Sequence, residues 1–87
     1  MPRVFIPAQL RGLTGGEADV EASGATVREL IAMLESRFPG LRERLTTGGE
    51  LSPTLQVSID GVFSRRGLDA AVEPHSEVHF LPIFGGG

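Results

Sequence analysis

The sequence predicts a small α+β domain in which one helix packs on one face of a mixed sheet, with the elements in the order ββαβββ. Three patterns support this prediction. Short segments with a two-residue apolar period lie near both ends of the chain, one segment with a helical period lies between them, and Asp60-Gly61 marks a tight turn between two further strands. At 87 residues the chain has room for one domain, which we expect at residues 1–82, followed by a tail at residues 83–87.

The first two strands are predicted from alternating side chains. Residues 3–6 alternate in strand fashion, and Pro7 limits this strand because proline has no N–H to donate to a neighbouring strand. Residues 17–22 alternate charged and apolar side chains, as in a strand with one face in water. The glycine-rich stretch between them, residues 12–16, predicts a connecting loop. These segments together predict a hairpin with a long loop.

One main helix is predicted at residues 27–38. Thr26 and Glu29 have the spacing of a capping box, in which each side chain accepts a hydrogen bond from a free amide at the helix start. Pro39-Gly40 ends the helix, and residues 41–45 have room for one further turn. Five apolar side chains recur at the helical period and form one stripe: Val27, Leu30, Ile31, Leu34 and Phe38.

The second half of the chain predicts three more strands. Residues 46–54 are predicted to be a loop, and residues 55–59 alternate as a strand. Asp60-Gly61 then turns the chain into a short return strand at residues 62–63. After an irregular stretch, residues 77–82 form the last strand and lead directly into the tail. In such an architecture the first and last strands often pair in parallel, and we expect that pairing here.

The alternation divides the first and last strands between two faces of the sheet. One face is predicted to lie against the helix and carries Val4, Ile6, Val78 and Phe80. The opposite face carries Phe5, His79 and Leu81. With Ile83 and Phe84, the apolar side chains of this opposite face form a predicted docking patch beside the tail. The alternative interpretation is that they are scattered surface hydrophobes with no such role.

The composition excludes several kinds of site. There is no cysteine, and His75 and His79 are too few for a closed zinc site, so any sulfur chemistry must use sulfur brought from elsewhere. Neither histidine has an evident partner for acid–base work. The net charge of −3 and the scattered arginines argue against nucleic-acid binding. No apolar run approaches about 18 residues and no leader is evident, so we expect a cytoplasmic protein.

The tail is the predicted reactive part of the chain. Three glycines follow Phe84, and the last of them, Gly87, carries the α-carboxylate. Glycines add nothing to a core, but from Phe84 to Gly87 the chain reaches about 13 Å and enters a slot too narrow for any side chain. A frayed chain end is the alternative interpretation.

Several of these features occur together in one known family. The strand order, Ala8-Gln9-Leu10-Arg11 after the first strand, and Phe80-Leu81-Pro82 before the terminal glycines resemble the ThiS/MoaD family of sulfur carriers, which have the ubiquitin-like β-grasp fold. The resemblance covers essentially the whole chain. Residues 14–16, 22–26 and 38–45 are more similar to the family's carrier for cysteine synthesis than to the small subunit of molybdopterin synthase.

The resemblance implies a carrier protein and not an enzyme. An activating enzyme of the E1 type would use ATP to adenylate the carboxylate of Gly87, and sulfide or a persulfide would displace AMP to leave a thiocarboxylate. Gly85 and Gly86 would thread the partner's active site, and the carrier itself would bind no cofactor. The sulfur acceptor would be a pyridoxal-phosphate-dependent cysteine synthase or, as a close second, the large subunit of molybdopterin synthase. The residues implied to contact the partner are Phe5, Leu81, Ile83 and Phe84.

The third glycine departs from the family pattern, because members usually end in two. Retention of Gly87 would place the reactive carbonyl up to about 3.5 Å farther out than in a two-glycine relative. Trimming to Gly86, or a deeper slot in the partner, would each accommodate this difference. Two alternative functions stay open at this point: a ubiquitin-like modifier joined to lysines of other proteins through the same carboxylate, and a non-covalent binding module that uses the sheet face alone.

Overall fold

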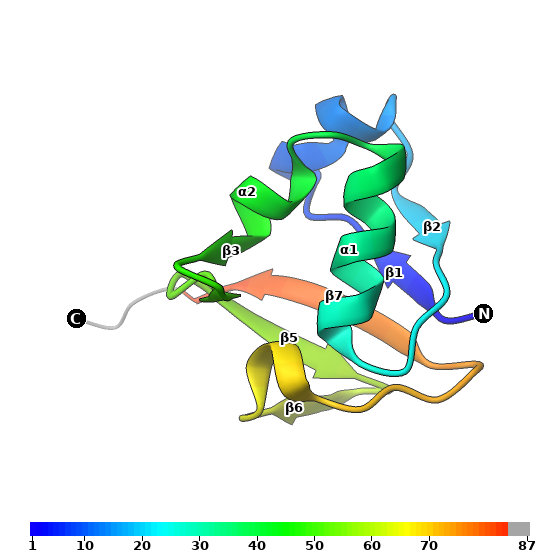
Figure 1. Cartoon of the computed structure of the whole chain (residues 1–87), viewed down its shortest axis with the longest axis vertical. Coiled ribbons are helices and arrows are strands. Elements are labelled where there is room, and N and C mark those ends of the chain that lie inside the picture. Colours follow the sequence, from blue (N-terminus) through cyan, green and yellow to red (C-terminus); the bar gives the residue numbers. More distant parts are fainter. Residues whose placement is uncertain (84–87) are drawn as a thin grey trace.

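The chain folds around a five-stranded mixed sheet that carries one long helix on a single face (Figure 1). A computed structural model describes residues 1–83. The central pair, β1 and β7, is parallel, with Val4 opposite Val78, and all other neighbours are antiparallel. This is the β-grasp arrangement, and it confirms the predicted fold class. The strand order across the sheet is β2 (Asp19–Glu21), β1 (Arg3–Phe5), β7 (Glu77–Pro82), β5 (Leu55–Ile59) and β6 (Val62–Ser64).

The connection between β1 and β2 differs from the predicted loop. It contains a 3-10 helix, η1 (Ala8–Thr14), which begins after Pro7 and ends at Gly15. Leu10 and Thr14 are buried, and the Thr14 hydroxyl group donates to a backbone carbonyl group of the same segment. The prediction of a loop was wrong because a short 3-10 segment has little sequence signal of its own and is stabilised here by the burial of its side chains.

The main helix, α1 (Val27–Arg37), forms as predicted and ends one residue earlier, with Phe38 as its C-cap. The capping box is present: the Thr26 hydroxyl oxygen accepts from the Glu29 amide at 3.2 Å, and the Glu29 carboxylate accepts from the Ala25 amide at 2.8 Å. The predicted stripe faces the sheet, where Val27, Leu30, Ile31 and Leu34 are buried. In Figure 1 this helix lies across the sheet, so only one of the two sheet faces is covered.

A second short helix and a small hairpin follow. The helix α2 (Leu41–Leu45) confirms the further turn that residues 41–45 allowed. The predicted loop at residues 46–54 was wrong in part, because β3 (Thr46–Thr47) and β4 (Glu50–Leu51) pair as a two-stranded antiparallel sheet. Gly48 and Gly49 both have positive φ, as a two-residue turn of this kind requires. Gly48-Gly49 is a sequence typical of a two-residue hairpin turn, and it was the sequence signal for this hairpin.

The hairpin of β5 and β6 turns at Asp60-Gly61 and is tied to the start of β7. Asp60 has φ 52°, a conformation that aspartate tolerates better than most residues. Its carboxylate accepts from the Glu77 amide and from the Ser76 hydroxyl group, both at 2.9 Å. These two hydrogen bonds, first that from Glu77, lower the pKa of Asp60 below its ordinary value.

This interaction predicts an acid-dependent loss of stability. A carboxyl group whose pKa is lowered on folding stabilises the native state above its unfolded pKa, and this contribution disappears as the pH falls through the folded pKa. Asp60→Asn keeps a residue that tolerates positive φ but removes the charge. We expect urea unfolding at pH 7 to show a lower free energy of unfolding for this variant than for the wild type, with the difference shrinking towards pH 2. Glu17→Gln, at an exposed position of the same domain, removes one negative charge without removing the Asp60 hydrogen bonds and is the matched control.

The burial pattern confirms the predicted faces of β1 and β7. The side chains on the helix side are almost completely buried, whereas Phe5 and His79 on the opposite face are half-buried and Leu81 is exposed. Within residues 1–83, no helix has the length and apolar character needed to cross a membrane. The core consists of Val4, Ile6, Leu10, Val20, Ala22, Val27, Leu30, Ile31, Leu34, Leu41, Leu45, Leu55, Val57, Leu68, Ala70, Val72, Val78 and Phe80.

Candidate functional site

The uncovered sheet face carries an aromatic pair beside the end of β7. Phe5 and His79 lie opposite each other in the parallel β1–β7 ladder, and their rings stack with centroids 4.1 Å apart and planes 5° apart. Leu81 lies two residues farther along the same face and is 37% exposed. The stack covers part of the His79 ring on a face without a helix, so His79 is half-buried and has a packing role.

A shallow groove of about 310 Å³ runs along this part of the molecule. The guanidinium Nε of Arg11 donates to the Ile6 carbonyl oxygen at 3.1 Å, which fixes the side chain at the groove. Neither terminal nitrogen of Arg11 has a hydrogen bond within residues 1–83. The sheet-side residues that line the groove are Phe5, Ile6, His79, Phe80, Leu81 and Pro82, and those from the start of η1 are Pro7, Ala8, Gln9 and Arg11.

The beginning of the predicted tail is held by the sheet. β7 lies between β1 and β5: residues 77–79 pair with β1 and residues 78–82 pair with β5, with Pro82 opposite Leu55 at the last position of the β5–β7 ladder. The Ile83 amide then donates to the Thr54 carbonyl oxygen at 2.8 Å, and Ile83 is 46% exposed. The chain thus leaves the domain from a fixed point next to the groove. The predicted site residues Phe84, Gly85, Gly86 and Gly87 lie outside the described residues.

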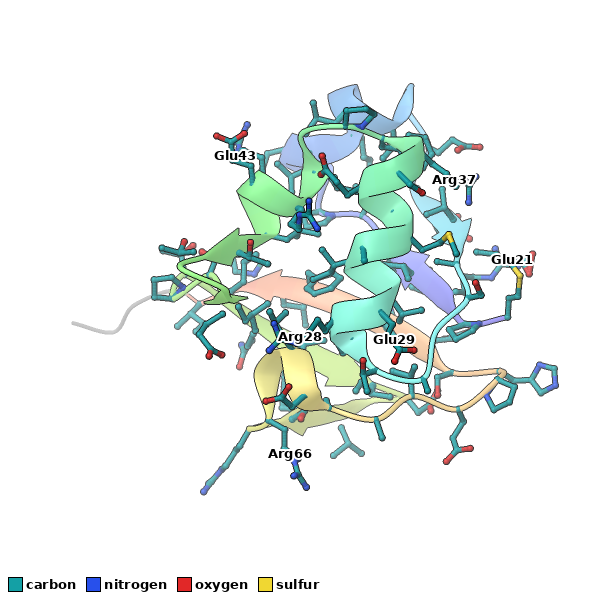
Figure 2. The ribbon with its side chains drawn as sticks, viewed as in Figure 1. Glu21, Arg28, Glu29, Arg37, Glu43 and Arg66 are labelled. Atoms are coloured by element: carbon teal, nitrogen blue, oxygen red, sulfur yellow. The ribbon has the colours of Figure 1, made fainter. Side chains whose placement is uncertain are left out.

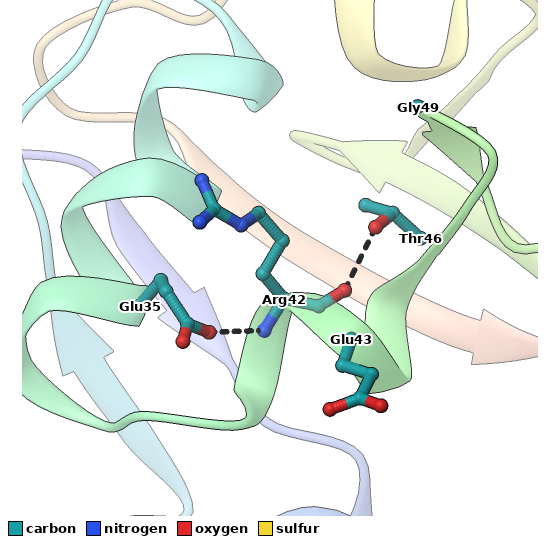
Figure 3. A pocket seen from close by; sticks show the side chains of 5 residues that line it. All are labelled: Glu35, Arg42, Glu43, Thr46 and Gly49. Carbon is teal, nitrogen blue, oxygen red and sulfur yellow. Dashed lines mark hydrogen bonds between the residues drawn. The ribbon is translucent and has the colours of Figure 1, made fainter.

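A second hollow lies on the helix side, between α1 and α2 (Figure 3). Its polar groups hold the fold together. Both oxygens of the Glu35 carboxylate accept backbone hydrogen bonds at the start of α2, from Gly40 at 3.1 Å and Arg42 at 2.8 Å. These bonds, with that from Arg42 first, lower the pKa of Glu35. Thr46 closes the other end of α2 by donating to the Arg42 carbonyl oxygen at 2.8 Å. This arrangement caps a short helix and carries no reactive constellation.

Residues 1–83 contain no group of three histidine, cysteine, aspartate or glutamate side chains placed to hold a metal ion. His75 is exposed in the turn before β7, and His79 stacks on Phe5. The distinctive features are therefore an anchored chain end, an uncovered apolar face and a groove between them.

Comparison with known proteins agrees with this arrangement over the full length of the chain. The model of the ThiS family matches residues 4–87. The chain belongs to the ThiS family. The sulfur carrier protein CysO of Mycobacterium tuberculosis is 35% identical over 89 residues, which span 97% of this chain and 96% of that protein. This family membership confirms the resemblance from which the function was predicted.

Solved structures of similar proteins share the fold. The crystal structure of the Amycolatopsis orientalis BexX/CysO complex contains a chain that is 39% identical, with a TM-score of 0.92 and coverage of 100% of both chains. The crystal structure of SAMP1 from Haloferax volcanii is 26% identical, with a TM-score of 0.72 and coverage of 99% of this chain and 98% of that one. The first is described as a complex of a CysO protein with a second protein.

Sequence reasoning placed Phe5 and Leu81 on one face, and the structure brings them together with His79. It did not find the groove or the position of Arg11 within it. The position of Arg11 depends on the 3-10 helix, which returns the chain to the end of β7 after Pro7. Ala8-Gln9-Leu10-Arg11 was noted only as a family feature, and nothing in the sequence alone indicates that its arginine faces β7.

Proposed function

We propose that this chain is a sulfur carrier protein that is charged at the carboxylate of Gly87. The observation that supports the proposal best is the continuity of the ThiS-family match from residue 4 to residue 87, with the end of β7 paired to β5 before the tail begins. A rigid last strand holds the attachment point, while glycines supply reach without bulk. Residues 83–87 act as the reactive tail of a domain formed by residues 1–82.

The chemistry requires an activating partner, because a free carboxylate is a poor acyl donor. In the proposed reaction the Gly87 carboxylate attacks the α-phosphorus of ATP, pyrophosphate leaves, and an acyl-adenylate forms. Sulfide (HS⁻) then attacks the carbonyl carbon, AMP leaves and a proton is released, and the product is a terminal thiocarboxylate. The carrier's own residues do two things: Phe5, Leu81, Ile83 and Phe84 contact the partner, and Gly85 and Gly86 pass through its narrow entrance. No cofactor is bound by the carrier, and ATP is consumed by the E1-like partner.

Cysteine synthesis is the proposed destination of the sulfur. The likeness to CysO along the whole chain supports this branch over molybdopterin synthesis, which stays the second candidate within the family. The acceptor enzyme is then a pyridoxal-phosphate-dependent cysteine synthase, and the carrier acts with it in the cytoplasm. A carrier for this pathway should visit its partner transiently, whereas a molybdopterin synthase subunit should purify in a stable complex with the large subunit.

The intact mass of the chain isolated from its source cells, without added reductant, tests the proposal. We expect a fraction that is heavier by one oxygen-for-sulfur exchange, and fragmentation of the C-terminal peptide should place the sulfur on Gly87. Sulfur on Gly86 in a shortened chain would mean that the third glycine is trimmed. If no chain carried sulfur at its terminus in cells starved of cysteine and of molybdenum cofactor, that result would contradict the proposal.

A ubiquitin-like modifier is the second candidate function. It is favoured by the likeness to SAMP1 of Haloferax volcanii, which is described as a small archaeal modifier protein. The same acyl-adenylate would then pass to lysines of target proteins. Because all eight basic residues of this chain are arginine, the chain has no lysine of its own to accept it. Conjugates on a denaturing gel under oxidative or sulfur stress would support this candidate, and their absence would argue against it.

Leu81, an exposed apolar side chain close to the tail, should affect the rate at which the chain is adenylated. Leu81→Asp places a charge in the proposed contact with the activating enzyme, where a central apolar contact typically contributes about 2 kcal/mol or more. We therefore expect a loss of about 30-fold or more in the rate of adenylation at limiting carrier concentration. Met33→Asp, at an exposed position on the helix side, is the matched control and should be adenylated like the wild type. Equal losses in both variants would contradict the assignment of the face.

A further inference from the structure

The two outer edges of the sheet are built differently. β2 and β6 are the edge strands, at opposite ends of the five-stranded sheet (Figure 1). An edge strand presents unpaired N–H and C=O groups to which another chain can add, and proteins normally protect these groups. The protection at β2 is visible in the contacts of the described residues, whereas β6 has none of the same kind.

The β2 edge is partly covered by an arginine side chain. Val4 and Val20 lie opposite each other between β1 and β2, and by the alternation of an antiparallel ladder the backbone groups of Glu21 point outward. The Glu21 carbonyl oxygen accepts from the Arg37 guanidinium group at 2.8 Å. Arg3 of β1 forms an ion pair with the Asp19 side chain of β2. Figure 2 shows Arg37 and Glu21 on this side of the molecule, away from Arg66.

The β6 edge is open and apolar. Asp60-Gly61 forms a two-residue turn, so Ile59 and Val62 beside it exchange backbone hydrogen bonds, and the next residue, Phe63, directs its N–H and C=O groups away from β5. Within residues 1–83, the hydrogen bonds to β6 outside its ladder with β5 are limited to one at the Ser64 side chain. Val62 is 68% exposed and Phe63 is 56% exposed, and these side chains point to opposite faces of the sheet.

Two arginines follow this open edge directly. Arg65 and Arg66 are exposed, and neither guanidinium group has an ion pair or hydrogen bond within residues 1–83. In Figure 2 Arg66 projects away from the domain beyond β6. A guanidinium group without a carboxylate partner can pair with an incoming acid, and both lie where a strand that continues past Ser64 would pass.

We propose that the β6 edge binds an extended acidic segment of a partner protein as a sixth strand. The segment pairs with the outward N–H and C=O groups of Phe63, places apolar side chains beside Val62 and Phe63, and brings carboxylates to Arg65 and Arg66. This mode combines backbone pairing, which gives affinity, with side-chain contacts, which give specificity. The site is separate from the proposed tail chemistry. The tail follows β7 in the middle of the sheet, whereas β6 is an outer strand and β5 lies between the two.

A peptide titration tests this inference on the full-length chain. The probe is an acetylated and amidated pentapeptide that alternates glutamate and valine, added to isotope-labelled protein and followed by amide NMR. We expect shifts centred on Val62–Ser64 and slower solvent exchange of the Phe63 amide. Arg65→Glu with Arg66→Glu should weaken binding about tenfold or more, and high salt should weaken it too. Arg42→Glu with Arg44→Glu carries the same change of net charge on α2 and should bind like the wild type.

Two further peptides separate strand addition from simple charge attraction. In the first peptide the central residue is N-methylated, so it lacks an N–H group that the added strand needs. In the second peptide glutamine replaces glutamate, so the negative charge is lost. Both should bind at least several-fold more weakly. Equal binding of the N-methylated peptide, shifts centred on Phe5 and Leu81, or equal losses in the two double variants would overturn the inference. Protection of Phe63 that rises with protein concentration in the absence of peptide would also overturn it, because a second copy of this chain would then be the occupant.

Discussion

Removal of Gly86 and Gly87 should abolish thiocarboxylate formation at the end of this chain while leaving its fold intact. The variant then ends at Gly85, and its carboxylate lies up to about 7 Å short of the position that Gly87 reaches, which is too far for in-line attack on ATP in the same active site. The last hydrogen bond of the described chain, from the Ile83 amide to the Thr54 carbonyl oxygen, precedes the deletion. We expect no thiocarboxylate by intact mass after incubation with the activating enzyme, ATP and a sulfur source, and a Tm equal to that of the wild type.

Deletion of Gly87 alone is the informative companion to this variant. Full charging of a chain that ends at Gly86 would mean that the third glycine is dispensable, as in relatives with two. Loss of charging would locate the chemistry at Gly87. Charging of the chain that ends at Gly85 would contradict the proposed role of the tail, and unchanged partner binding by that variant would favour the non-covalent module that uses the sheet face.

Leu34→Ala should remove a large part of the stability of the domain. Leu34 is completely buried in the stripe of α1 that faces the sheet. Truncation of a buried leucine costs about 2–5 kcal/mol, from lost apolar burial and from the cavity that is left. The total stability of a domain of this size is about 5–15 kcal/mol, so the variant should unfold at a much lower urea concentration and at a Tm lower by about 10–30 °C.

The neighbouring Met33 gives a matched control for this measurement. Met33 lies on the same helix but is 40% exposed, so Met33→Ala removes a similar volume of side chain with little change in burial. We expect its Tm to stay close to that of the wild type, since exposed helix positions favour alanine slightly. A comparable loss of stability in both variants would mean that the helix, and not the packing of its stripe, determines the stability of the fold.

The elements that the sequence predicted well are those with a strong local pattern. The helix α1 has both a capping box and a continuous apolar stripe, and the strands β5 and β7 have clear alternation with turn residues beside them. The elements that it missed are short: the 3-10 helices η1 and η2 (Gly67–Asp69) and the two-residue strands β3 and β4. Such segments are too short to show a clear apolar periodicity, so the sequence says little about their secondary structure. Tertiary contacts decide their conformation.

The candidate site divides in the same way. That Phe5, His79 and Leu81 share a face follows from the two-residue period, because each strand position fixes the direction of its side chain. That Phe5 and His79 stack at 4.1 Å does not follow, since it depends on the register with which β1 pairs with β7. The position of Arg11 at the groove depends in turn on the path of η1.

By itself the sequence determined the fold class, the apolar side of the helix, the face on which each strand residue lies and the family whose chemistry uses the terminal glycines. Those properties are local, because hydrophobic period, capping residues and turn residues act over a few positions in the chain. Only the tertiary structure decided which side chains meet across strands and which sheet edge stays open. Register and edge protection arise from residues far apart in the sequence, as in the hydrogen bond from Arg37 to the Glu21 carbonyl oxygen, which covers part of the β2 edge while β6 has no equivalent among the described residues.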